Sequence, residues 1–259
     1  MLAPPIAMCR VIVFLGPTLG LAVAQKELAA DYRPPAIRGD IYRAGTERPD
    51  AILLIDGIFA SRPAVMHKEI LWVLSQGIPV WGTSSLGALR AAELNDDGMQ
   101  GWGRVFTDYR DGHIEDDDEV AVQHGPAELS WMPTSVAMID IRYCLGRACA
   151  EGIIDGLTLD LALTTAKRLY FPERNYRRIL NELGASLGPV PQIAALRRWL
   201  LVHVFSQKAV DAASALGAIG QVISMAPRGT FDADFPTTMY WRYHARHAVS
   251  VPTERRDSL

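Results

Sequence analysis

Three short apolar runs, each closed by turn residues, constrain the fold of this chain more than any other feature. They are Val11–Leu15, Ala51–Ile55 and Ile78–Trp81, and each is apolar along its length rather than at every second residue. Strands that are apolar on both faces are typical of parallel sheets covered by helices on each side. Because these runs alternate with helix-forming stretches, their order predicts an α/β fold with a doubly wound, Rossmann-like core.

The remaining segments add to this core and then change to an α-helical second half. Further short strands are expected at Ala36–Ile41, after a proline pair that ends the first helix, and at Val120–His124. Helices are expected from about residue 19, at 63–76 and 86–94, and then roughly at 134–151, 158–170, 173–184, 190–205 and 207–225. We therefore expect a core domain over residues 9–130, a helical region over 131–225, and a C-terminal arm or tail over 226–259.

Charge and cysteine content narrow the class of protein. Lys and Arg number 26 against 29 Asp and Glu, and this balance argues against a nucleic-acid binder and against attraction to membranes. The three cysteines form no C-x-x-C pattern, so we expect no disulfide frame, no structural zinc and a cytoplasmic protein. Residues 11–24 also resemble a signal peptide, but a buried first strand is favoured because no Lys or Arg precedes Arg10.

The stretch Ile78–Leu94 reads as strand, tight turn and helix, and it places serines at a functional position. The turn is Thr83-Ser84-Ser85-Leu86-Gly87, one substitution away from the G-x-S-x-G pattern that holds a nucleophilic serine at the start of a helix. The positive end of a helix stabilises a developing negative charge. Serine and threonine are also ordinary helix caps, so a purely structural turn is the alternative.

Polar and glycine residues follow the other expected strands in the same way. Gly16 and Thr18 come after the first run, and Asp56 and Gly57 come after the second. Parallel sheets bind ligands beyond the carboxyl ends of their strands, so these residues and Ser85 are expected to form one cluster. An oxyanion hole could use the backbone N–H of Leu86 together with a donor from either of the other two turns.

The helix expected over 63–76 is apolar on nearly all sides except at His67-Lys68-Glu69. Burial of Lys68 among apolar neighbours would lower its pKa, as a lysine general base requires. Ser85 with Lys68 is therefore the preferred catalytic pair, and His67 is the alternative base. A surface Lys68 that extends its ammonium into water is the structural alternative.

The remaining polar motifs give less support for a cofactor. The acidic run Glu115–Glu119 lacks the spacing of a calcium loop, and a solvated or partner-facing loop is favoured over a Mg²⁺ or Ca²⁺ site. The sequence has no G-x-G-x-x-G and no phosphate-loop lysine, and its histidines lack metal-ligand spacing. We expect neither a metal nor a cofactor.

Several runs in order along residues 10–125 resemble the TfuA-like proteins, and Gln207-Lys208 and Asp211 match this family more loosely. The matching runs are Phe14–Leu19, Pro34–Ile41, Ile55–Phe59, Ala64–Leu71, Gly87–Leu94, Gly98-Met99 and Asp117–Ala121. The resemblance implies a partner of YcaO enzymes, which use ATP to activate a backbone amide so that sulfur replaces its oxygen. It further implies hydrolysis of a thiocarboxylated, ThiS-like carrier protein that supplies the sulfide for thioamidation of a peptide or protein.

The family's active site is a Ser-Lys pair, and the resemblance assigns it to Ser85 and Lys68, with Ser84 as the rival nucleophile because the turn contains two adjacent hydroxyls. Arg90 either orients the carrier terminus or pairs with Glu93. The alternative function is a non-catalytic adaptor that enhances binding of a precursor peptide to the YcaO enzyme. Neither function requires nucleic acid or a membrane.

Overall fold

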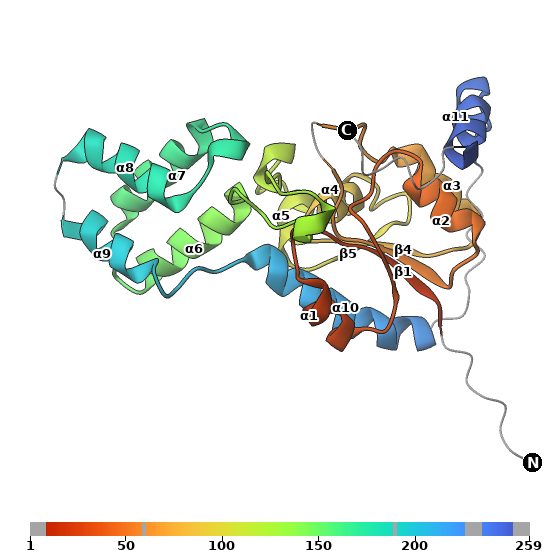
Figure 1. The fold of residues 1–259 in the computed structure, drawn as a ribbon, viewed down its shortest axis with the longest axis horizontal. Helices are drawn as coiled ribbons and strands as arrows, with labels where there is room; N and C mark the ends of the chain where they lie inside the picture. The colour runs from red at the N-terminus through yellow and green to blue at the C-terminus, as the bar shows by residue number, and fades with distance from the viewer. Residues whose placement is uncertain (1–8, 59–60, 189–190, 226–234, 251–259) are drawn as a thin grey trace, which may run out of the picture.

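The core of the protein is a five-stranded parallel sheet in the order β2-β1-β3-β4-β5. A computed structural model describes residues 9–58, 61–188, 191–225 and 235–250 (Figure 1). The strands are β1 (Val11–Phe14), β2 (Asp31–Arg33), β3 (Ala51–Leu54), β4 (Val80–Thr83) and β5 (Gln100–Trp102). This order reverses between β1 and β3, as in doubly wound folds, so the expected parallel-sheet core is confirmed.

Two of the expected strands are wrong. Ala36–Ile41 forms only a single bridge, between Ala36 and Gly57, because helix α2 begins at Asp40 and the Asp40 carboxylate accepts the N–H of Ile37. In Val120–His124 only His124 bridges, to Pro133. The sheet instead uses β2 and β5, which are three residues long and contain no apolar run, so their pairing rather than their composition defines them.

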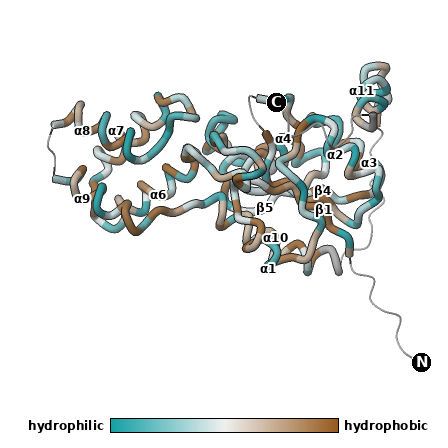
Figure 2. Tube along the Cα trace, viewed as in Figure 1, coloured by the Kyte–Doolittle hydropathy of each residue, from teal (hydrophilic) through white to brown (hydrophobic). Residues whose placement is uncertain are grey.

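Helices cover both faces of the sheet. One face carries α2 (Asp40–Thr46), α3 (His67–Ser75), α4 (Leu86–Glu93) and α5 (Arg104–Arg110), and the other carries α1 (Leu21–Glu27) and α10 (Gln207–Met225). The trace is hydrophobic along β1, as expected for a strand between two helical layers (Figure 2). Among the described helices, none is long and apolar enough to cross a membrane.

The helical lobe lies beside the core and contains α6 (Met138–Ala150), α7 (Gly156–Arg168), α8 (Tyr176–Leu187) and α9 (Pro191–Trp199) (Figure 1). These helices enclose a separate apolar core. Helix α10 falls within the expected helical region of 131–225, yet it returns to the sheet and packs Ala212, Leu216 and Ile219 against its α1 face. The chain therefore leaves the core after α5, builds the lobe and then comes back.

Helix α11 (Met239–Ser250) lies in the range expected to be an arm or tail, and it docks on α2 and α3 (Figure 1). Its Trp241 is buried against the rings of Tyr42 and Trp72. The Arg43 guanidinium also donates a hydrogen bond to the carbonyl of Ala248, so both ends of the helix contact the core.

The acidic run joins the core to the lobe. The carboxylates of Asp116, Asp118 and Glu119 surround the Lys167 ammonium of α7, with 2.9 Å to Asp116 and 2.8 Å to Glu119. Glu119 is buried and also accepts two 2.9 Å hydrogen bonds from Arg142 of α6. A solvated loop is therefore the wrong interpretation for Glu119, because its charge is neutralised by cations of the lobe.

Candidate active site

The carboxyl ends of β1, β3 and β4 bring the expected polar residues to one edge of the sheet. Leu54 pairs with Phe14 on one side and with Gly82 on the other. Just beyond the strands, the N–H of Gly16 donates to the Asp56 carboxylate, and Ser84 directly follows the end of β4. The polar residues after β1 and β3 thus lie on either side of the point where strand order reverses, the usual ligand position of such sheets.

Asp56 organises the turn that follows β1. Its Oδ2 accepts the N–H groups of Gly16 at 2.9 Å and Thr18 at 3.1 Å, and its Oδ1 accepts the Thr18 hydroxyl at 2.6 Å. Asp56 is completely buried. The structure therefore brings together Gly16, Thr18 and Asp56 as expected, with the carboxylate fixed by three donors rather than turned toward solvent.

Ser84 has a strained backbone in the turn between β4 and α4. Its φ is +65°, a left-handed value that is uncommon for residues other than glycine. The N–H of Ser85 donates to the carbonyl of Thr83 at 2.8 Å, so Ser84 is the central residue of a γ-turn of the rare, strained kind. Such strain is expected where a nucleophile must be presented at the start of a helix. This geometry favours Ser84 over Ser85.

Backbone donors converge on the same turn. The N–H of Gly87 donates to the carbonyl of Ile55, and those of Ala88 and Leu89 donate to the carbonyl of Ser85. Leu86, the first residue of α4, has no recorded acceptor for its N–H among the described residues, as is usual at a helix start. Leu86 is therefore available as the expected oxyanion donor.

Close packing holds this turn against β3. A Cβ on Gly87 would lie 1.8 Å from the carbonyl oxygen of Leu54, and one on Gly57 would lie 2.0 Å from the Leu86 side chain. Glycine is therefore required at both positions.

Lys208, at the start of α10, is the buried lysine of this edge. Its side chain is 2% exposed, and its ammonium donates a 2.8 Å hydrogen bond to the carbonyl of Val120. Burial lowers the pKa of Lys208, against the opposing effect of the Asp56 and Asp140 carboxylates. A buried lysine with a lowered pKa that interacts with Asp56 has the property that a general base requires.

The two bases predicted on α3 lie elsewhere. Lys68 is only partly buried, and its ammonium donates to the hydroxyl of Thr238 at 3.5 Å. His67 is exposed and pairs through Nε2 with Glu93 at 2.8 Å. Among the described residues, neither side chain forms a hydrogen bond or ion pair with Ser84 or Ser85. The expected burial of Lys68 is wrong, because the one fully buried polar residue of this turn is Glu69, which accepts the N–H of Gly39.

Arg90 forms one of its two predicted interactions. It pairs with Glu93, and its Nε donates to the carbonyl of Val65 at 3.2 Å, while only 13% of its side chain is exposed. The predicted pairing with Glu93 is therefore confirmed, although on a largely buried side chain, and the orientation of a carrier terminus by Arg90 stays a prediction.

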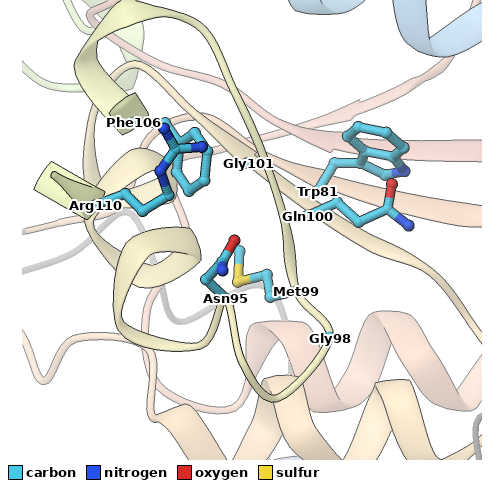
Figure 3. A pocket seen from close by; sticks show the side chains of 8 residues that line it. All are labelled: Trp81, Asn95, Gly98, Met99, Gln100, Gly101, Phe106 and Arg110. Atoms are coloured by element: carbon cyan, nitrogen blue, oxygen red, sulfur yellow. The ribbon is translucent and has the colours of Figure 1, made fainter. Parts of the chain in front are cut away.

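A surface hollow of about 470 Å³ lies at β5, away from this edge (Figure 3). Its lining includes Trp81, Met99, Phe106 and Arg110, but none of the residues that cluster around Asp56. The chemistry of the candidate site therefore depends on buried groups at the carboxyl edge rather than on this hollow.

The sequence does not predict the burial of Lys208, although Gln207-Lys208 and Asp211 belong to the runs that resemble the family. The structure separates the roles of this motif: Lys208 faces Asp56, whereas Asp211 accepts the N–H of Val105 at 2.7 Å and the Gln207 amide at 2.7 Å. Asp211 thus caps α5. The sequence sign of this burial is that apolar residues of α10 lie one helical turn from Lys208. Many surface lysines share this pattern.

The model of the TfuA-like protein family matches residues 56–175. This segment contains Asp56, Ser84, Ser85 and the junction with the lobe, and it ends before Lys208. No curated protein matches the chain.

Proposed function

We propose that this chain, a TfuA-like protein by its match over residues 56–175, hydrolyses the C-terminal thiocarboxylate of a ThiS-like, ubiquitin-fold carrier and so releases sulfide. The observation that carries the proposal is the strained turn at Ser84, directly after β4, at the carboxyl edge of the sheet where the buried Lys208 interacts with Asp56. Strained serines and lysines with lowered pKa values are the two halves of a Ser-Lys hydrolase site.

Lys208 is the base that the burial pattern supports in place of Lys68. It is buried beside Asp56, whereas Lys68 is held at the α11 side of α3 by Thr238. A neutral amine is required to accept the serine proton, and burial favours that neutral form. The nucleophile is Ser84 in this proposal, and Ser85 is the rival that the experiment separates.

The reaction proceeds by acyl transfer. Neutral Lys208 accepts the proton of the serine hydroxyl as Oγ bonds to the thiocarboxylate carbon, and the charge that forms on oxygen is held by the N–H of Leu86 and the start of α4. Cleavage of the C–S bond expels the sulfur, which takes the one proton held by Lys208 and leaves as hydrosulfide, HS⁻, so the amine is neutral again. Water, activated by the same amine, then cleaves the serine ester and releases the carrier carboxylate.

The burial of both serines favours a narrow substrate. Ser84 has no exposed surface and Ser85 is 3% exposed. An extended Gly-Gly terminus has no side chains to accommodate, so it suits such a site better than an ordinary peptide. The released sulfide then passes to a YcaO enzyme, which uses ATP to place sulfur in a peptide backbone.

Sulfide release from a thiocarboxylated carrier tests this assignment. We expect Ser84→Ala and Lys208→Met to lower kcat by about 10²-fold or more, and Ser85→Ala and Lys68→Met to lower it less than about fivefold. Loss of activity in Ser85→Ala with an active Ser84→Ala would move the nucleophile to Ser85.

If the native protein releases no sulfide from the thiocarboxylated carrier, this result contradicts the hydrolase proposal. If that native protein also tightened peptide binding by the YcaO enzyme, the adaptor function would be favoured instead. Circular dichroism of each variant provides the control for folding.

A further inference from the structure

We propose that Asp140 is the positioning residue of Lys208, and that it links the helical lobe to the site. The proposal rests on the hydrolase function, because it concerns the base of that reaction. Asp140 belongs to α6, which contributes no other side chain to the described contacts of Lys208. It contacts the beginning of α10 through both of its carboxylate oxygens.

The contacts of Asp140 fix the first turn of α10. Its Oδ1 accepts the N–H of Lys208 at 3.0 Å, and its Oδ2 accepts the hydroxyl of Ser206 at 3.0 Å. The Ser206 oxygen in turn accepts the N–H of Ala209 at 3.1 Å, which is the hydrogen bond of an ordinary helix cap. Asp140 therefore holds both the cap and the backbone of the lysine itself.

Asp140 also compensates the charge of Lys208. Three elements contribute groups that face this ammonium: Asp56 after β3, the carbonyl of Val120, and Asp140 of α6. On α10 itself, Asp211 lies three residues further along and is engaged by Val105 of α5 and by Gln207. Asp140 is 9% exposed, so water screens its interaction with Lys208 only weakly.

The packing of α6 determines which parts of the molecule Asp140 connects. Met138 and Ile141, on either side of Asp140, are buried in the core of the lobe. Ile139, next to Asp140, is buried in the core on the α4 side of the sheet, and the hydroxyl of Tyr143 donates to Asp108 of α5 at 2.8 Å. Helix α6 is therefore anchored in both cores, and Asp140 joins it to the start of α10.

Removing the charge of Asp140 should shift the pKa of Lys208 in a predictable direction. A carboxylate near Lys208 favours the protonated amine and raises the pKa of that amine, so Asp140→Asn lowers it further. Activity that needs the neutral amine rises as pH passes through this pKa. The acidic limb of the pH profile of kcat/KM is therefore expected to move to lower pH by about one unit in Asp140→Asn.

Two variants serve as controls. Ser206→Ala removes one contact of Asp140 and the cap but keeps the charge, so it should lower stability and leave the acidic limb in place. Asp160→Asn changes an exposed carboxylate of α7 and should change neither property. An acidic limb that is the same in Asp140→Asn and the native protein would overturn the proposal.

A direct titration separates this proposal from the hydrolase function. Isotope-edited NMR of lysine Cε and Nζ, with Lys208 assigned by comparison with Lys208→Met, reports the pKa of this amine without any substrate. We expect a lower midpoint in Asp140→Asn than in native protein. An unchanged midpoint would refute Asp140 as a positioning residue, whereas absent sulfide release with a shifted midpoint would refute only the hydrolase proposal.

Discussion

Two lysines connect the lobe to the core, the buried Lys208 and the half-buried Lys167, and the shifts of their pKa values have opposite signs. Burial lowers the pKa of Lys208 more than Asp56 and Asp140 raise it. Burial also opposes the charge of Lys167, but the hydrogen bonds that its ammonium donates to Asp118, Glu119 and Asp116 outweigh burial and raise the pKa of that amine.

The difference lies in direct contact. Lys167 touches three carboxylates, and Arg142 and Arg174 supply two further cations to the same acidic run. The Lys208 ammonium instead hydrogen-bonds a neutral carbonyl. A satisfied cluster stabilises a junction, whereas an incompletely compensated, buried lysine is suited to proton transfer.

Replacing each lysine with methionine should give the largest difference in effect between the two positions. Lys208→Met removes the general base and is expected to lower kcat/KM for sulfide release by about 10²- to 10⁴-fold while the chain stays folded. Lys167→Met should leave kcat/KM within about threefold and lower stability instead. Steady-state sulfide release and urea unfolding of both variants provide the measurements, and equal activity losses would contradict the division of roles.

Arg174 should show the largest stability effect at the junction. Its side chain is 1% exposed and donates to the carbonyls of Ala166, Leu169 and Asp118 as well as to the Asp118 carboxylate. Arg174→Met leaves these acceptors without their donor and should lower the free energy of unfolding by about 3 kcal/mol. Urea titration measures this loss, and Arg178→Met, at an exposed pair on α8, should cost less than about 0.5 kcal/mol.

Acidification should weaken the junction in a defined range. Burial alone would raise the pKa of Glu119, but hydrogen bonds from Arg142 and Lys167 outweigh it and the pKa falls below its ordinary value of 4.5. A lowered pKa contributes stability above pH 4.5 that is lost as pH falls through the folded value. The stability difference between native protein and Glu119→Gln should therefore narrow from pH 6 to pH 3. A constant difference in urea unfolding would contradict this.

The turn at Ser84 should give the smallest change in stability. Glycine adopts a positive φ without strain, so Ser84→Gly should raise the free energy of unfolding by about 1 kcal/mol while abolishing sulfide release. Arg48, exposed with a φ of +56°, provides the matched control, since Arg48→Gly should stabilise without affecting activity. Destabilisation by Ser84→Gly would show that the hydroxyl, which lies 3.3 Å from that of Thr83, contributes more than the strain costs.

The sequence predicts well those parts that local pattern determines. The apolar runs at Val11 and Ala51 are strands β1 and β3, and the turn at Ser84 and Ser85 falls between a strand and a helix as expected. Strands β2 and β5 have no such pattern, because three polar or glycine-containing residues form a strand only when a neighbour pairs with them.

Side-chain roles were less predictable because they depend on contacts distant in sequence. Lys68 and Lys208 both have apolar neighbours, and only the docking of α10 between α6 and Val120 decides which of them is buried. Likewise, the sequence alone does not distinguish the two adjacent serines, whereas the positive backbone φ of Ser84 does. The site residues remain predictions until the variants are measured.

Because α10 returns to the sheet late in the sequence, it determines when folding of the core can finish during synthesis. The sheet is complete once Trp102 has been made, yet of the two helices on the apolar face that includes Val13, Leu53 and Trp81, only α1 is present until residues 207–225 emerge. At a synthesis rate of roughly 5–20 residues per second, that interval lasts several seconds. A nascent chain therefore displays an aggregation-prone surface while it still lacks its buried amine. The same helix that ends this exposure also delivers Lys208, so burial of the sheet and assembly of the site occur in one folding event.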